Sequence, residues 1–257
     1  DFRFRHFSVE DGLSSNSVRA ITQDKYGFLW IGTEEGLNRY DGIMIKSYSI
    51  CPQAAGKYIS SLYGTKKNIW IGTDEGIYIY AYATETFTYF DLTTPNNVRI
   101  TSIVNHILQD KDGNLWFSTN GQGLFRYNLS KNYLEQYEFT SAFGIVASTM
   151  ADSDNQIWAL TNQGESGVYK LNKAENKFEP FGLLYNAGNH HSQALAMLED
   201  SEQTLWLGTW ECGLQKIDKY TRQTTTYLHP TDGKGVTHIH SLMEYAPHQL
   251  LIGSDDG

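Results

Sequence analysis

The side chains best suited to metal chemistry are histidines, of which the chain has eight. His190 and His191 are adjacent, His238 and His240 are separated by one residue, and His106 stands apart. Adjacent histidines rarely converge on one ion without a third ligand at a suitable spacing. We therefore expect no metal site and no cofactor.

The carboxylates are the next candidates for chemistry. The strings DKDGN at 110–114 and DSDNQ at 152–156 have the opening of a calcium loop but lack a bidentate Glu at the twelfth position, so we interpret them as hairpin turns. A glycosidase needs two carboxylates about 5 to 10 Å apart, and a lyase needs a base near an acidic proton. Neither set can be picked out, because most carboxylates lie in turns. We therefore predict no catalytic residues.

Composition narrows the class of protein further. The 257 residues are 40% hydrophobic and carry a formal net charge of -9, which favours a globular chain and disfavours nucleic-acid binding. Apolar runs such as 77–83 are far shorter than the roughly 18 residues of a membrane helix. The start at Asp1 shows no leader, so we expect a cytosolic chain or one whose signal was removed. Cys51 and Cys212 are too few for a disulfide framework and are expected to be free thiols.

An internal repeat provides the elements that would position any site. An apolar core containing Trp, as in FLWIGTEEGL and NIWIGTDEGI, recurs at intervals of 40, 46, 42, 48 and 45 residues. The six repeats are centred on Trp30, Trp70, Trp116, Trp158, Trp206 and, with Leu in the Trp place, Leu251. Each core is preceded by one strand-like stretch and followed by two more, so a repeat has four short strands.

Four strands in about 40 to 45 residues predict a blade of a β-propeller. We therefore expect an all-β fold of four-stranded antiparallel blades, with about five and a half blades of a seven-bladed ring present as one partial domain over residues 1–257. Residues 2–9 are predicted to be the closing strand of the last blade. The five motif Trp residues are interpreted as structural, because a fixed register in a buried strand is typical of packing.

The unit SNSVRAITQDKYGFLWIGTEEGLNRYDG resembles the repeat of the two-component regulator propellers, the periplasmic sensor part of bacterial hybrid two-component systems. Ser118, Ala159 and Leu160 depart from the usual Ile-Gly pair, and Leu251 departs from Trp. The resemblance implies a non-catalytic periplasmic sensor that responds to a glycan, in a protein anchored in the inner membrane with its histidine kinase elsewhere. It also implies adjacent sensor domains, or a homodimer, as partners.

The loops at one end of the strands are the expected binding face, because rigid scaffolds commonly carry function on loops. These loops are longest in repeats three to five, and Trp210 is the one Trp outside the repeat register, suited to stacking on a sugar ring. The candidate ligand-binding residues are Asn120, Gln122, Gln163, Glu165, Tyr185, Asn189, His190, His191, Trp210 and Glu211. The alternatives left open are a propeller glycosidase or polysaccharide lyase, and a protein-interaction scaffold.

Overall fold

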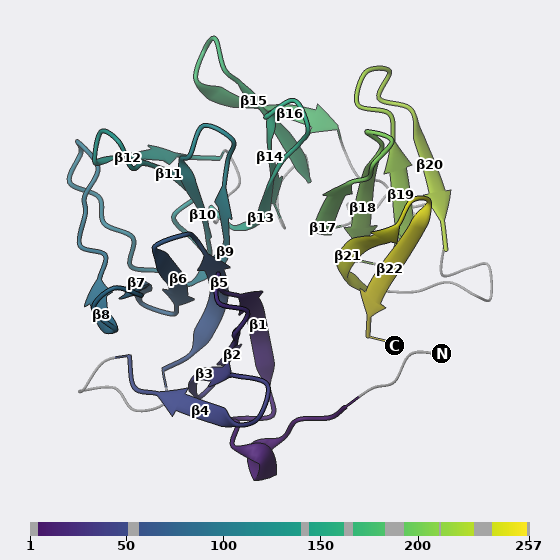
Figure 1. Ribbon diagram of the computed structural model, residues 1–257. Coiled ribbons are helices and arrows are strands. Elements are labelled where there is room, and N and C mark those ends of the chain that lie inside the picture. The colour runs from purple at the N-terminus through teal and green to yellow at the C-terminus, as the bar shows by residue number, and fades with distance from the viewer. Residues whose placement is uncertain are drawn as a thin grey trace. The chain divides into compact units, whose positions relative to one another are not determined.

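The computed structural model describes residues 5–50, 57–139, 144–161, 167–182, 193–210, 212–228 and 238–255. These residues form β-strands and one short 3-10 helix, η1 (Val9–Asp11). The chain divides into two compact units, Asp1–Ile107 and Leu108–Gly257, and the division falls within one strand. Figure 1 shows the strands gathered into separate small sheets.

Unit 1 contains two complete four-strand repeats. Their strands are β1 (Val18–Gln23), β2 (Leu29–Thr33), β3 (Gly36–Tyr40), β4 (Ile45–Tyr48), β5 (Ile59–Gly64), β6 (Asn68–Thr73), β7 (Gly76–Ala81) and β8 (Thr86–Tyr89). The next strand, β9 (Val104–Gln109), runs across the division.

Unit 2 continues the pattern through repeats three to six. Its strands are β10 (Leu115–Thr119), β11 (Leu124–Asn128), β12 (Tyr133–Tyr137), β13 (Val146–Ala151), β14 (Ile157–Thr161), β15 (Val168–Asn172), β16 (Lys177–Gly182), β17 (Ala194–Glu199), β18 (Leu205–Thr209), β19 (Leu214–Ile217), β20 (Thr224–Tyr227), β21 (Ile239–Ala246) and β22 (Gln249–Ser254).

Each of the first five repeats is one sheet in which strands pair in sequence order, and every registered pair is antiparallel. The sixth repeat contributes the hairpin of β21 and β22 among the described residues. The all-β class and the four-stranded antiparallel blades predicted from the sequence are therefore confirmed. The seven-bladed ring stays a prediction.

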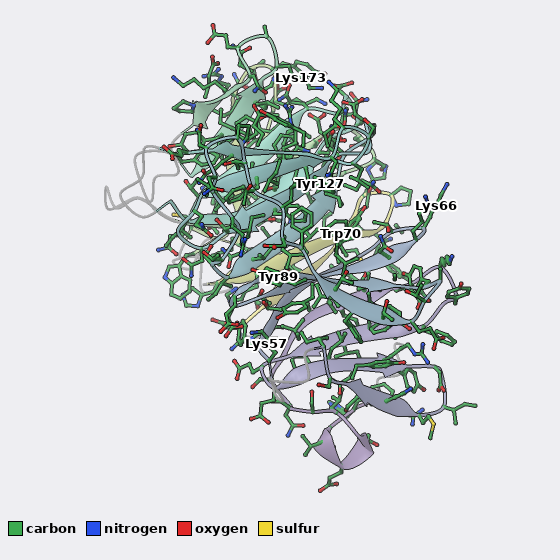
Figure 2. All side chains as sticks on the ribbon, turned by 90° about the vertical axis from the view of Figure 1, so that its left-hand side faces the viewer. Lys57, Lys66, Trp70, Tyr89, Tyr127 and Lys173 are labelled. Atoms are coloured by element: carbon green, nitrogen blue, oxygen red, sulfur yellow. The ribbon has the colours of Figure 1, made fainter. Side chains whose placement is uncertain are left out.

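The motif Trp residues are mostly core residues, as predicted. Trp30, Trp116 and Trp158 are at most 1% exposed, and Trp70 is 3% exposed. Figure 2 shows the contrast between Trp70, which lies among the side chains of its sheet, and Lys66, which points away from it. Trp206 is only partly buried. Leu251 at the same place in repeat six is 45% exposed.

An Asp in the turn before the core strand fixes four of these Trp side chains. Its Oδ2 accepts the indole N–H six residues later, at 2.8 Å in the first and third repeats, 3.0 Å in the fourth and 2.7 Å in the fifth. Its Oδ1 accepts backbone N–H groups of the same turn, as Asp24 does from Tyr26 and Phe28. The turn and the core are thus joined through one carboxylate. In repeat two Thr65 takes the Asp place.

The small residue that follows the Trp motif lets the next repeat pack closely. A Cβ on Gly32 would lie 2.5 Å from Ile59 Cγ2, and one on Gly208 would lie 2.5 Å from Ile239 Cγ2. In repeat four the order of sizes is reversed, because Leu160 stands in the Gly place and the next repeat presents Ala194, both in one buried cluster. The departure at Leu160 is therefore matched by a smaller neighbour.

The strand predicted for residues 2–9 is corrected in part. No strand is assigned to residues 5–8, and Val9 begins the 3-10 turn, which Ser8 caps by accepting from the Glu10 backbone N–H at 3.2 Å. Residues 1–4 lie outside the described residues. The local reason is a capping box in which the Ser8 backbone N–H also donates to Asp11 Oδ2 at 2.9 Å, so the chain turns at this point.

Candidate functional site

Threonine at the end of the core strand holds the loop that carries Trp210. The Thr209 hydroxyl donates to the Gly213 carbonyl at 2.7 Å and accepts the Cys212 N–H at 3.1 Å. Gly213 has φ of 68°, and a Cβ there would lie 2.5 Å from the Tyr227 carbonyl oxygen. A larger residue would clash at Gly213, so the loop requires glycine there. Trp210 directly follows the last residue of the core strand, which fixes its position.

Trp210 is exposed and bound to the next repeat. Its side chain is 40% exposed, and its backbone forms a β-bridge with His238. Its indole stacks on the His238 imidazole, with ring centroids 3.7 Å apart and planes inclined by 30°. A second backbone bond runs from the Trp210 N–H to the Gln193 carbonyl, at 2.9 Å. The tryptophan is thus a pre-positioned platform rather than a free surface side chain.

Asp255 joins two histidines beside that platform. Its Oδ2 lies 2.6 Å from His238 Nδ1, and its Oδ1 lies 2.9 Å from His240 Nε2. The hydrogen bond with His238, and then that with His240, hold the pKa of the Asp255 carboxyl below its usual range. We call Trp210, His238, His240 and Asp255 the Trp210 cluster. It offers a flat aromatic surface, imidazole nitrogens and a carboxylate at one place on unit 2.

The same strand positions form an ion pair in repeat one. Arg19 stands where His240 stands in the sixth repeat, and its Nε donates to Glu34 Oε1 at 3.0 Å. Glu34 follows the last residue of β2, just as Asp255 follows the last residue of β22. The acidic loop tips, interpreted from the sequence as plain turn residues, thus bind a side chain of the first strand in both repeats.

Three of the ten predicted ligand-binding residues lie among the described residues. Trp210 belongs to the cluster above. Asn120 is exposed and forms the equivalent β-bridge to Ile145 in repeat three. Gln122 lines a polar hollow with a cavity volume of about 170 Å³ beside Gln136 and Glu138. The other seven lie outside the described residues, namely Gln163, Glu165, Tyr185, Asn189, His190, His191 and Glu211.

Sequence reasoning identified Trp210 and weighed the spacing of His238 and His240, but it did not join them. The repeat pattern contains the signal that joins them. The residue just before the first strand of one repeat lies beside the residue just after the core strand of the preceding repeat. The bridge of Asn120 with Ile145 obeys the same rule. His238 would therefore have been placed beside Trp210 by aligning repeats five and six.

No cluster of three or more His, Cys, Asp or Glu side chains suited to a metal ion occurs in the described ranges. Cys212 is buried and is not part of a disulfide, and Cys51 lies outside those ranges. Among the described residues, none of the helical structure is long and apolar enough to span a bilayer.

Residues 12–35 and 97–121 match the family described as Two component regulator propeller. The resemblance drawn from the repeat sequence is therefore confirmed. Among curated proteins, Histidine kinase P4 of Formosa agariphila is 49% identical over 53 residues, which cover 21% of this chain and 4% of that protein.

Solved structures share the fold over nearly the whole chain. One is the extracellular domain of BT3049 from B. thetaiotaomicron, a protein assigned to the hybrid two component systems. It is 24% identical over 98% of this chain and 34% of that one, with a TM-score of 0.78. Virginiamycin B lyase from Staphylococcus aureus is 16% identical over 93% of this chain and 78% of that one, with a TM-score of 0.71. The chain thus spans about a third of the BT3049 structure and a small part of the kinase.

Proposed function

We propose that the chain is a sensor domain of a two-component signalling protein, on the periplasmic side of the membrane, and that it responds to a glycan without converting it. The observation that carries the proposal is the exposed Trp210 platform, held by stacking and a β-bridge within propeller repeats of the two-component regulator type. Support for the location comes from the extracellular domain with the same fold.

The chemistry of the Trp210 cluster suits a sugar ring. A pyranose has an apolar C–H face that stacks on an aromatic ring and hydroxyl groups that both donate and accept hydrogen bonds. Trp210 is 40% exposed for the first role, and His240, whose side chain is 48% exposed, stands close by for the second. Because the stack with His238 already fixes the indole, little side-chain entropy is lost on binding.

The useful output of such a domain is a population shift, which requires different ligand affinity in two states. Adjacent domains of the same protein, or a second copy of the chain, would detect that shift. Turnover would remove the ligand that the domain reports. We therefore propose binding without hydrolysis or elimination, and no role in nucleic-acid binding.

A second candidate function is elimination, as in a propeller lyase. One observation favours it: His238 is hydrogen-bonded to Asp255 in the arrangement that orients a general base, and the fold is shared with a lyase. Against it, His238 is stacked under Trp210, and its side chain is only 21% exposed. The product assay below decides between the two.

The test uses the wild-type chain and a panel of poly- and oligosaccharides, with calorimetry and product analysis on the same samples. Binding is expected without product, and Trp210→Ala should abolish it, because the variant removes contact area outside the blade core. The exposed Tyr220→Ala serves as a matched control for loss of a surface aromatic. Sustained product formation that His238→Gln abolishes would instead establish the enzyme.

A further inference from the structure

Two neighbouring junctions between repeats in unit 2 are built from equivalent positions. Asp110 and Asp112 in the turn of repeat three correspond to Asp152 and Asp154 in the turn of repeat four. Ala151 pairs with the first residue of β14, as Glu199 pairs with the first residue of β18. Lys173 likewise corresponds to Lys219, because each lies three residues after the lysine that pairs with the motif Trp of its repeat.

The junction of repeats four and five is closed by its lysine. Lys219 Nζ lies 2.8 Å from Glu199 Oε1 and 3.0 Å from Asp154 Oδ2, with Asp152 Oδ2 at 3.8 Å. The Lys219 side chain is only 4% exposed. Glu199 also accepts from the Ser153 hydroxyl at 3.1 Å. The Lys219 ammonium group and the Glu199 carboxylate together fill the space at this junction.

The junction of repeats three and four is open. Ala151 replaces the glutamate, and Lys173 is exposed and forms no ion pair with a residue that the structure describes. A pocket with a cavity volume of about 150 Å³ remains, which we call the Lys173 pocket. It is lined by Asp110, Asp112, Asn114, Trp116, Arg126, Asn155, Ile157, Leu171, Lys173 and Asn176.

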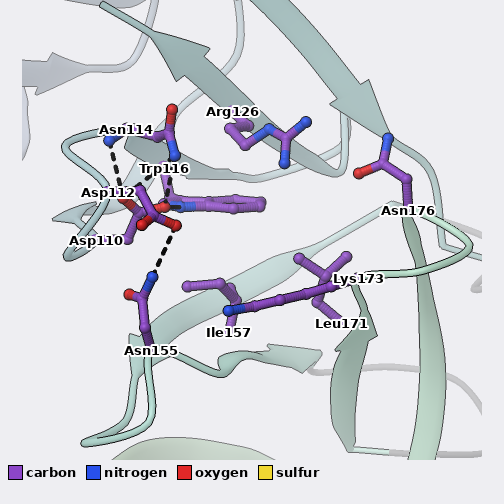
Figure 3. A pocket seen from close by; sticks show the side chains of 10 residues that line it. All are labelled: Asp110, Asp112, Asn114, Trp116, Arg126, Asn155, Ile157, Leu171, Lys173 and Asn176. Atoms are coloured by element: carbon purple, nitrogen blue, oxygen red, sulfur yellow. Dashed lines mark hydrogen bonds between the residues drawn. The ribbon is translucent and has the colours of Figure 1, made fainter.

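Figure 3 shows how the polar groups of the Lys173 pocket lie. Asp112 and Asn155 are at one end, where Asn155 Nδ2 donates to Asp112 Oδ2 at 2.9 Å. Arg126 and Asn176 lie toward the other end, and the Lys173 side chain lies across the pocket from Trp116. The amide of Asn155 is bonded at both ends, because its oxygen also accepts the Lys111 N–H at 2.9 Å.

The polar groups of the Lys173 pocket that can form further hydrogen bonds determine which kind of ligand fits it. Lys173 retains its donors, and Asp112 retains an oxygen, so the pocket offers both donors and acceptors. Two carboxylates and two cations line it, which balance to a formal charge of zero. Ile157 and Leu171 add an apolar wall. The volume is below the roughly 300 to 1,000 Å³ of pockets for drug-sized ligands, so one ring fits better than a chain.

From this geometry we infer that the Lys173 pocket binds a single neutral pyranose unit, separately from the Trp210 cluster. The inference rests on the proposed glycan response and assigns it a second, smaller site at the opposite ends of the strands. Hydroxyl groups accept from Lys173 and donate to Asp112, and the C–H groups contact the apolar wall.

The test titrates methyl glycosides of glucose, galactose and mannose into the full chain, with ligand-observed saturation-transfer NMR and calorimetry. Glucuronate and glucosamine are the charged comparators. At least one neutral glycoside should bind, and each charged comparator should bind more weakly. Ala151→Glu, which copies the closed junction, and Lys173→Met should each weaken binding about tenfold or more. Lys177→Met is the matched control, because Lys177 is exposed and lies outside the pocket.

Should Ala151→Glu fail to fold, Lys173→Met still decides, because that exposed side chain has no ion pair to lose. Binding unchanged in Lys173→Met, or no binding of any neutral glycoside to the wild type, would overturn the inference. The two sites are distinguishable: Trp210→Ala should leave monosaccharide binding within about twofold. Glycan binding lost only in Trp210→Ala would leave the proposed function standing while the Lys173 pocket is rejected.

Discussion

At the scale of single residues, the turn Asp and the core Trp act as a pair. In four repeats one carboxylate both closes a turn and accepts the indole N–H, which satisfies a nitrogen that is buried in three of them and partly buried in the fifth repeat. The sequence shows the Asp six residues before the Trp, and it was interpreted as a turn residue. The indole bond could not be inferred from turn chemistry, because it depends on the rotamer of a distant side chain.

Trp116→Ala should destabilise the protein by roughly 3 to 5 kcal/mol, because it removes a large side chain that is 1% exposed. Its loss also leaves Asp110 without the indole donor. Glu35→Ala, at an exposed loop tip, should change the free energy of unfolding by no more than about 0.5 kcal/mol. Denaturant titrations of both variants provide the comparison, and small effects of equal size would contradict the packing role.

Lys219→Met should destabilise the protein by about 3 to 5 kcal/mol, because it leaves the buried carboxylates of Asp152 and Glu199 without their shared cation. Burial opposes the charged form of Lys219, but hydrogen bonds to Glu199 and Asp154 outweigh it and raise its pKa. Lys173→Met, at the equivalent exposed position, should stay within about 0.5 kcal/mol. Equal losses in thermal and denaturant unfolding would show that the two junctions do not differ.

His106 gives unit 1 a predicted pH dependence. Burial lowers its pKa from 6.5 to about 4, so the folded protein keeps the imidazole neutral where the unfolded chain takes up a proton. Its contribution to stability is therefore complete above pH 6.5 and is lost as the pH falls toward about 4. His106→Gln should flatten this part of the stability profile relative to wild type. The exposed His248→Gln is the control, and identical profiles for all three proteins would refute the assignment.

At the scale of elements, the contact between successive repeats depends on matched sizes. Gly32 faces Ile59 and Gly208 faces Ile239, whereas Leu160 belongs to the same cluster as the small Ala194. From the sequence, the Ile-Gly signature identified the blades and Leu160 stood out as a departure. The compensating small residue is Ala194, which lies in the first strand of the next repeat, so it cannot be found from one repeat alone.

A double-mutant cycle tests this matching. Ala194→Ile alone should overpack the cluster beside Leu160 and cost about 1 to 3 kcal/mol. Combining it with Leu160→Gly restores the arrangement of the other repeats, so the two changes together should cost less than the sum of the single changes. Strict additivity in denaturant unfolding would mean that the two side chains do not share one space.

Candidate sites were less predictable than strands for a physical reason. Strands follow from apolar spacing and turn chemistry within about 45 residues, and those signals are local. The Trp210 cluster draws on two repeats, and the Lys173 pocket lies at the junction where Ala151 takes the place that Glu199 has in the next repeat. Only a comparison of equivalent positions between repeats brings such residues together.

At the scale of the whole molecule, the first five repeats share one four-strand pattern, and both proposed sites lie at positions that depart from it. Turns and core strands recur with the same bonds, while Trp210 and the open Lys173 pocket do not recur among the described residues. If the proposed sensing is correct, ligand contacts can vary at these irregular positions while the repeated turns and core strands stay the same.

The most direct test of glycan binding without turnover is one calorimetric titration of a glycan panel into the wild-type chain, with the samples analysed for products afterwards. We expect heat of binding for at least one glycan, its loss in Trp210→Ala, and unchanged glycan at the end. Product that accumulates with time and disappears in His238→Gln would contradict it and would identify the Trp210 cluster as the active site of an enzyme.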